Sequence, residues 1–232
     1  MFEFPFDLLI LIAAGLFAGF VNTIAGGGSL LTLPLLIFLG LPPATANGTN
    51  RIAIFVSASA ATLGFRSKNI NSFPFSLYLG IAALLGALIG ARIAVEIDGL
   101  LFNKILAIIM IAVVFLMVLK PNYKSQLLEP KTTGKILIWS MVAFFFIGIY
   151  GGFINAGIGF IIMLFLNYVN KLDLVRVNAT KVALVLVYTT GALITFVLSG
   201  HINLEYGIAL AIGNAAGAFF ASRYAVRKGC AD

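Results

Sequence analysis

Residues 19–31 read GFVNTIAGGGSLL. Three consecutive glycines, at 26–28, interrupt a stretch that is otherwise apolar enough to lie in a membrane, and Asn22 and Ser29 flank them. Each glycine costs a helix about 1 kcal/mol relative to alanine. Irregular backbone is tolerated at membrane depth only where protein or a wet cavity covers it. The stretch therefore predicts a helix that breaks inside a membrane protein at a covered position.

The composition around this stretch is that of a membrane protein. Of 232 residues, 61% are hydrophobic and only 10% are charged, whereas soluble proteins are about 25% charged. Apolar runs such as 73–95 and 100–119 approach the roughly 20 residues that cross a bilayer as a helix. The first run carries Glu3 and Asp7 where a signal peptide would be basic. We therefore predict an all-α, polytopic membrane protein that contacts lipid through several helices.

The net charge of +7 comes from Lys and Arg that collect in three stretches, 66–72, 120–135 and 223–229. Such residues accumulate on the cytoplasmic side of membrane proteins, so we interpret the charge as a mark of sidedness and expect no nucleic acid partner. The stretches 96–99 and 199–205 contain acids without Lys or Arg and fit the outer side. The single cysteine, Cys230, excludes an intrachain disulfide.

The charged breaks divide the chain into spans. Full spans are expected near 45–64, 73–95, 100–119, 177–198 and 204–222. Two further apolar regions, 6–41 and 136–171, are too long for one crossing and short for two, and each has glycines near its middle. A re-entrant hairpin and a pair of shortened spans both fit the length and the charges of these regions.

Three blocks of sequence recur in the same order. Residues 15–27 align with 148–160, residues 46–51 with 177–181, and residues 80–91 with 207–218. The charge pattern starts the two copies on opposite sides, as in the inverted repeats of many transporters. We predict a first repeat over 1–119, a cytoplasmic linker over 120–135 and an inverted second repeat over 136–232. The second repeat has no counterpart of 100–119, so its last helix is expected to be missing.

Glycines in this chain suggest two different roles. Four pairs are spaced i, i+4, as in close helix packing: Gly15/Gly19, Gly86/Gly90, Gly148/Gly152 and Gly213/Gly217. Packing does not need three glycines in a row, so we interpret 26–28 as functional. Free N–H groups at the helix start that follows such a break favour an anion.

A second group of polar residues follows each break. Asn47, Asn50 and Arg51 share one helix face because of their spacing, and Asn178 and Lys181 do so in the second copy. A cation inside a membrane costs about 2.5–3.5 kcal/mol, so it either faces a partner or a wet path, or its side chain extends to the membrane surface. Both interpretations stay open.

These groups give the candidate binding residues. They are Asn22, Gly26, Gly27, Gly28, Ser29, Asn47, Thr49, Asn50, Arg51, Asn155, Gly157, Gly159, Asn178, Thr180 and Lys181. No acid falls in the middle of an expected span, so a proton relay or a sodium site built on a carboxylate has no candidate. Amides, hydroxyls and two cations suit an anion. We predict no metal site and no cofactor.

The segment 19–54, GFVNTIAGGGSLLTLPLLIFLGLPPATANGTNRIAI, resembles the TauE/SafE sulfite exporter family, also called the 4-toluene sulfonate uptake permease family, and LGALIGARIA at 85–94 is similar to its later glycine block. The resemblance implies an inverted-repeat transporter of sulfite, sulfonates or related organic acids, in the cytoplasmic membrane of a bacterium or archaeon. The family pattern falls on Asn22, Gly26, Gly27, Gly28, Asn47, Thr49, Asn50 and Arg51, and more loosely on Asn155, Gly159, Asn178, Thr180 and Lys181.

Three classes of function are compatible with the sequence to different degrees. The leading hypothesis is a permease or exporter that moves a small anion by alternating access. An anion channel is the first alternative, because sequence separates channels from carriers poorly. A membrane-embedded enzyme is less supported, because His201 is the single histidine, in a short loop, and no paired acids occur within a span. We therefore expect no enzymatic activity.

Overall fold

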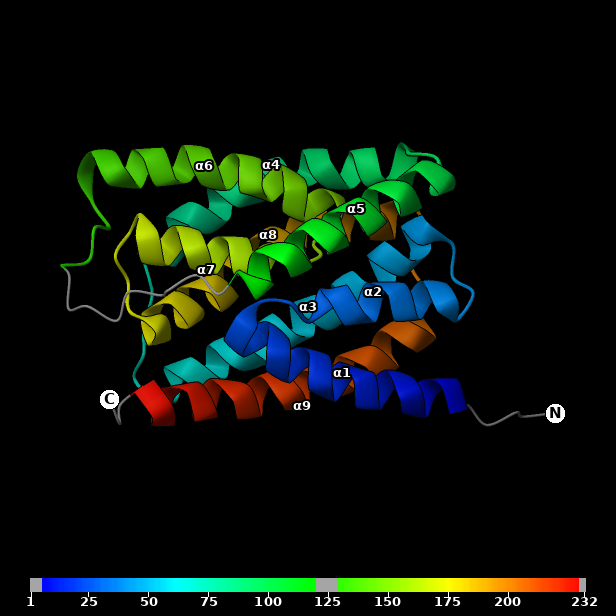
Figure 1. Ribbon diagram of the computed structural model, residues 1–232, viewed down its shortest axis with the longest axis horizontal. Helices are drawn as coiled ribbons and strands as arrows, with labels where there is room; N and C mark the ends of the chain where they lie inside the picture. Colours follow the sequence, from blue (N-terminus) through cyan, green and yellow to red (C-terminus); the bar gives the residue numbers. More distant parts are fainter. Residues whose placement is uncertain (1–5, 120–128, 230–232) are drawn as a thin grey trace.

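The computed structural model describes residues 6–119 and 129–229, so Cys230 and most of the predicted linker 120–135 lie outside the described residues. The described residues form α-helices and loops without any strand. The helices are α1 Phe6–Ala25, α2 Ser29–Phe38, α3 Pro43–Arg66, α4 Phe75–Glu96, α5 Gly99–Val118, α6 Gly134–Phe153, α7 Ile158–Tyr168, α8 Leu174–Leu198 and α9 Leu204–Gly229 (Figure 1). The predicted all-α class is confirmed.

Within the described residues, six helices are long and apolar enough to cross a membrane: α1, α4, α5, α6, α8 and α9. The predicted polytopic membrane architecture is therefore confirmed. Helix α3 differs from the expectation for 45–64, because it has 24 residues but is not apolar enough to qualify. Its polar side chains are buried against α8 and α9 rather than facing lipid.

The two long apolar regions each form a hairpin of a long and a short helix. In Figure 1, α2 returns alongside α1, and α7 returns from the end of α6. The turns use left-handed backbone at Gly26 (φ 78°) and Gly157 (φ 69°). The two breaks meet, because a Cβ on Gly26 would overlap the backbone of Gly159. A re-entrant hairpin and a pair of shortened spans both return the chain to the end where it started, as seen in Figure 1, so both interpretations stay open.

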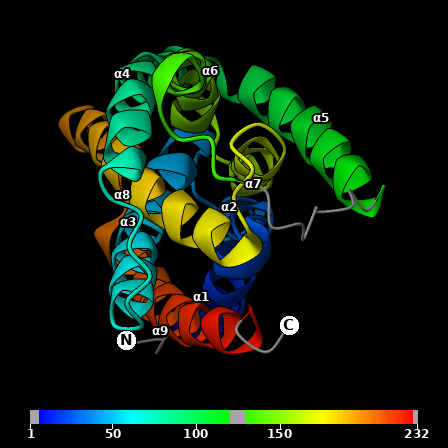
Figure 2. The same ribbon diagram turned by 90° about the vertical axis from the view of Figure 1, so that its left-hand side faces the viewer.

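Helices from the two parts of the chain pack in matching pairs, α1 beside α9 and α6 beside α4, and α3 and α8 lie between the two pairs (Figure 2). The glycines permit this contact. A Cβ on Gly19 would overlap the carbonyl oxygen of Asn214, and one on Gly152 would overlap that of Ala87. The other i, i+4 glycines likewise face backbone of the paired helix, so their predicted packing role is confirmed.

The arrangement of the paired helices supports the interpretation of an inverted repeat. Helices α1 and α6 run in opposite directions in Figure 1, and so do α9 and α4. Within each contact the partners are parallel, since Gly86 and Gly90 of α4 face Phe145 and Ile149 of α6 in rising order. Two oppositely oriented copies would produce this pairing. The duplication itself, with its boundaries, stays an interpretation.

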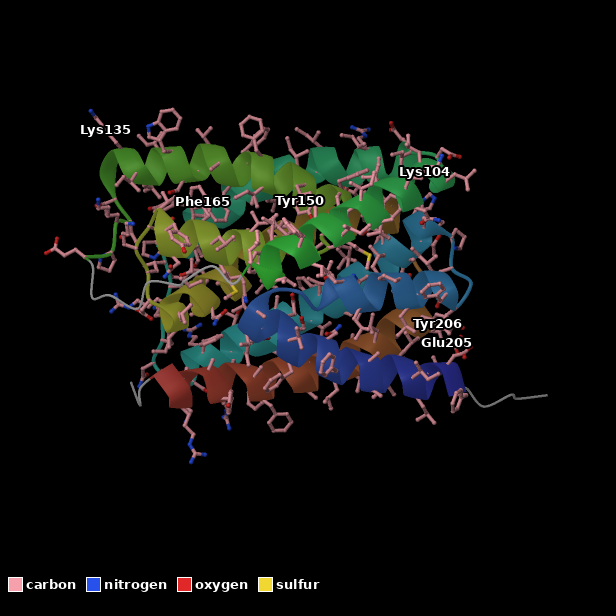
Figure 3. The ribbon with its side chains drawn as sticks, viewed as in Figure 1. Lys104, Lys135, Tyr150, Phe165, Glu205 and Tyr206 are labelled. Carbon is pink, nitrogen blue, oxygen red and sulfur yellow. The ribbon has the colours of Figure 1, made fainter. Side chains whose placement is uncertain are left out.

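Charged residues separate to the two ends of the bundle. One end, which we call the basic end, holds Arg66 and Arg227 at the ends of α3 and α9, and Lys135 and Arg176 at the starts of α6 and α8 (Figures 1 and 3). The opposite, acidic end holds the residues Asp7, Glu96, Asp98 and Glu205, together with Lys104. The described parts of the basic stretches thus share one end, which the positive-inside rule places in the cytoplasm.

The packing predicts a strong dependence on side-chain size at the paired glycines. Gly148→Ala places a methyl group on the carbonyl oxygen of Ala83, and such overpacking costs about 1–3 kcal/mol. Gly99→Ala is the matched control, because its Cβ would lie 3.6 Å from the Pro43 side chain. In detergent, the Gly148 variant should unfold several degrees below the wild type and the Gly99 variant close to it. Equal melting temperatures for the two variants would contradict this packing.

Candidate functional site

Lys181 binds the C-terminal end of helix α1. Its side chain comes from α8, is 2% exposed, and donates from Nζ to the carbonyl oxygens of Asn22 (3.0 Å) and Thr23 (2.8 Å). The same nitrogen donates to Oδ1 of Asn178 at 2.9 Å and lies 3.3 Å from Sδ of Met163. The ammonium therefore satisfies backbone acceptors just before the triple-glycine break.

Arg51 does the same for helix α6. Its side chain comes from α3 and is fully buried. Nη1 donates to the carbonyl oxygen of Gly151 at 2.6 Å, and Nη2 donates to that of Gly152 at 2.8 Å and to Oδ1 of Asn47 at 3.3 Å. The amide of Asn47 adds a bond to the carbonyl oxygen of Phe153 at 2.7 Å. Three successive carbonyls before the second break are thus bound.

The two cations donate hydrogen bonds to carbonyls that the helix breaks leave without a partner in their own helix. The last carbonyls of a helix have no partner within the helix and carry a partial negative charge, and hydrocarbon offers no donor. Arg51 lies in the first part of the chain and binds α6, whereas Lys181 lies in the second part and binds α1. The alternative that both side chains extend to the membrane surface is wrong, because both are buried.

The helix starts after the breaks also meet in the interior. Ser29, the first residue of α2, accepts a hydrogen bond of 3.3 Å from Nδ2 of Asn155 in the other break. Among the described residues, the backbone N–H groups of Gly27 and Gly28 find no acceptor within hydrogen-bond distance. Helices α2 and α7 thus direct their N-terminal, partly positive ends towards the contact of Gly26 with Gly159.

A small cavity lies beside this contact. It measures about 10 Å³, room for roughly a single water molecule. Its walls come from the end of α1, the start of α7, and α3 and α8: they include Asn22, Thr23, Ser57, Asn155, Gly159, Lys181 and Tyr188. The hydroxyl of Tyr188 donates to Oδ1 of Asn155 at 2.6 Å. The cavity is therefore polar and, in this conformation, closed around a very small volume.

The remaining predicted residues divide between the interior and the two ends. Asn50 accepts a 2.8 Å bond from Thr32 at Oδ1, while its Nδ2 and the Nε of Arg51 are buried without a partner among the described residues. Gly157 lies in the second break, where a Cβ would overlap Val113 of α5. Thr49 and Thr180 lie apart from the small cavity: Thr49 contacts the α8–α9 loop, and Thr180 lines a separate cavity at the basic end.

Sequence reasoning missed several polar residues of this region. Tyr188 is buried and follows Lys181 by two helical turns, a spacing that places both on one face of α8. Thr32 follows Ser29 by three residues on α2 in the same way. Both signals were available from spacing alone. The partners of the two cations were not, because they are backbone carbonyls a hundred or more residues away along the chain.

Acids are absent from this interior. Among the described residues, no Asp or Glu is buried, whereas Arg51 and Lys181 are. The only ion pair within the described residues joins Arg176 and Asp173 on the exposed surface. The buried positive charges therefore donate to carbonyl oxygens and face no carboxylate of the described residues.

Six apolar helices around two broken hairpins, with polar groups converging where the breaks meet, define a multi-pass integral membrane protein of the broken-helix transporter class. The family model described as sulfite exporter TauE/SafE matches residues 11–230. The chain belongs to this family of membrane transporters, as the motifs at 19–54 and 85–94 predict.

Curated bacterial relatives carry names of the same kind. The chain is similar to "Probable membrane transporter protein ORF9" of Sinorhizobium sp, at 29% identity over 99% of this chain and 87% of the relative. A probable membrane transporter protein of Haemophilus influenzae is 29% identical, with 96% and 87% covered. YfcA of Escherichia coli K12, also a probable membrane transporter protein, is 27% identical, with 97% and 83% covered. No solved structure matches the chain.

Removal of the Lys181 ammonium tests its role at α1. Lys181→Met removes the donor of the Thr23 carbonyl, whereas the Asn22 carbonyl keeps the N–H of Gly26 at 3.0 Å, and a buried unsatisfied group costs about 1–3 kcal/mol. The matched control is Lys104→Met, at an exposed position on α5. We expect a clear fall of the melting temperature in detergent for Lys181→Met alone. Indistinguishable melting of the two variants would show that the cap adds nothing to stability.

Proposed function

We propose that the protein is a carrier that moves a small anion across the membrane by alternating access, and that the anion binds where the two helix breaks meet. The observation that carries the proposal is the convergence of two cations and two helix starts in an interior without a buried acid. This region contains the candidate binding residues that were predicted at the two breaks. The family membership makes transport the expected activity of such a site.

The charges in the interior favour a negative ligand. Each helix end carries roughly half an elementary charge, positive at the start and negative at the end. The ends of α1 and α6 and the starts of α2 and α7 therefore offset one another, and the two formal charges of Arg51 and Lys181 are left. Burial of uncompensated charge is costly, so an anion that enters here stabilises the site. The unbonded N–H groups of Gly27 and Gly28 lie outside the cavity wall, at the start of α2, and become directional donors to the anion when the walls move apart.

The size of the cavity supports a carrier over a channel. A volume of about 10 Å³ is smaller than any sulfur oxyanion, so the described conformation is closed around its site. Binding of the anion then requires the walls to move apart, which is the behaviour of alternating access rather than of an open pore. The hairpins of the two halves touch through glycines at Gly26 and Gly159, and such contacts contain no interlocked side chains that would oppose the movement.

The substrate class follows from the family and from the donors. Sulfite and organosulfonates present several acceptor oxygens around one sulfur atom, and the site offers an ammonium, a guanidinium, side-chain amides and backbone N–H groups. The family description names a sulfite exporter. We infer a sulfur oxyanion, sulfite or an organosulfonate, with related organic acids as the neighbouring class.

Binding can be measured on the purified chain by thermal shift. Sulfite, sulfoacetate and 4-toluene sulfonate should raise the melting temperature at constant ionic strength, whereas potassium, sodium and choline chloride series should not. A ligand at one hundred times its dissociation constant stabilises a protein by about 2.7 kcal/mol. A shift with a cation and none with any of the anions would contradict the proposal.

Transport is tested in proteoliposomes with the anion that shifts melting most. Wild-type protein should show saturable counterflow, and Arg51→Ala and Lys181→Ala should abolish it. Because both variants also lose a helix cap, only variants that remain folded by circular dichroism count, and Lys104→Ala is the matched exposed control. Undiminished flux in both folded variants would remove Arg51 and Lys181 from the transport site.

A further inference from the structure

Thr49 and Thr180 occupy equivalent positions in the two copies. Each stands two residues after an aligned asparagine, Asn47 or Asn178, near the start of its helix. Helix α3 starts at the acidic end and α8 starts at the basic end (Figure 1), so the two threonines lie nearer to opposite ends of the bundle. They lie outside the small interior cavity, and the function proposed above does not use them.

At the acidic end, the loop between α8 and α9 is closed down on α3. Oγ1 of Thr49 accepts a hydrogen bond of 2.9 Å from the backbone N–H of Asn203. The carbonyl oxygen of His201 lies so close to Gly48 that a Cβ there would overlap it. Thr49 is fully buried. The polar groups behind it, Asn50 and Arg51, are thereby shut off from this end.

At the basic end, the equivalent position lies beside a cavity, although Thr180 is only 2% exposed and Ser72 of the loop between α3 and α4 donates a 3.5 Å hydrogen bond to the carbonyl oxygen of Ala179. Thr180 and Ala179 border a cavity of about 350 Å³ under the loop between α3 and α4. Polar groups on its wall are Asn69, Asn71, Ser72, Thr132 and Arg176. Within the described residues, the hydroxyl of Thr180 makes no hydrogen bond, in contrast to that of Thr49. The next residue along α8 is Lys181, which borders the interior cavity.

We propose that the anion reaches the interior site from the basic end through this cavity, which we call the vestibule. Thr49 and Thr180 are the latches of the two ends: each hydroxyl binds a loop that closes its end, and only one of the two bonds is present in each conformation. In the described conformation Thr49 holds the acidic end shut and the Thr180 latch is unbound. In the opposite conformation the Thr180 hydroxyl binds the α3–α4 loop and the bond from Asn203 to Thr49 is broken. The inference rests on the proposed alternating access and adds the two residues that set its balance.

Hydrogen exchange of the 199–203 loop measures the opening of the acidic end. Each threonine hydroxyl is assigned a hydrogen bond in only one of the two conformations. Loss of one such bond changes the ratio of the two conformations about two- to tenfold. Thr49→Val should therefore speed exchange of this loop about two- to tenfold. Thr180→Val should slow it by a similar factor, although Thr180 lies at the other end. Thr195→Val is the control, because its hydroxyl bonds within its own helix to Gly191.

The Thr180 variant separates gating from a local structural effect. A merely structural Thr180 has no hydrogen bond to lose here, so unchanged or faster exchange of 199–203 in Thr180→Val would overturn the latch assignment.

The vestibule is tested with Cys230→Ser, Thr180→Cys protein and a charged, membrane-impermeant thiol reagent. Rapid labelling from the basic side of sealed vesicles is expected, and protection from that side would refute the vestibule.

These experiments contain no anion, so their outcome is independent of the substrate. If labelling and hydrogen exchange follow the expectations above but no anion binds or is transported, the proposed function alone is contradicted. If anion flux is saturable but the exchange rate of 199–203 is unchanged in Thr180→Val, the latch assignment alone is contradicted.

Discussion

The structure depends on the capping of two interrupted helices by buried cations. Helices α1 and α6 end inside the protein, and Lys181 and Arg51 supply hydrogen-bond donors to their last carbonyls. Each cation belongs to the part of the chain opposite to the helix that it caps. The same hydrogen bonds therefore make the breaks possible, place positive charge beside them and tie the two halves together.

The sequence predicted the features that depend on local composition. The breaks at 26–28 and around Gly157 and the packing of the i, i+4 glycines follow from glycine placement within apolar runs, and the structure contains them. Arg51 stands four residues after Asn47, and Lys181 stands three residues after the aligned Asn178. Both side chains nevertheless reach that asparagine and carbonyls of the other half. Other features depend on contacts between distant residues. That Thr49 binds a loop backbone at Asn203, and that α3 is enclosed by protein, could not be predicted from spacing.

The description of the site changes accordingly. The expectation was that Arg51 and Lys181 face an anion directly. In the structure, both side chains instead donate hydrogen bonds to backbone carbonyl oxygens. Lys181 still borders the interior cavity, so a bound anion would compete with the end of α1 for its ammonium. Such competition would couple substrate binding to the contact between the halves, since the cap that an anion weakens is one of the bonds that join them.

The most direct measurement is the position of a heavy anion in a crystal of the protein. Selenite is a pyramidal oxyanion with three oxygens, like sulfite, and its selenium atom is located by anomalous scattering. The account predicts an anomalous peak where the two breaks meet, within hydrogen-bond reach of Lys181 and of the start of α2 or α7. Peaks confined to the basic surface, with the interior empty and both caps intact at saturating selenite, would contradict it.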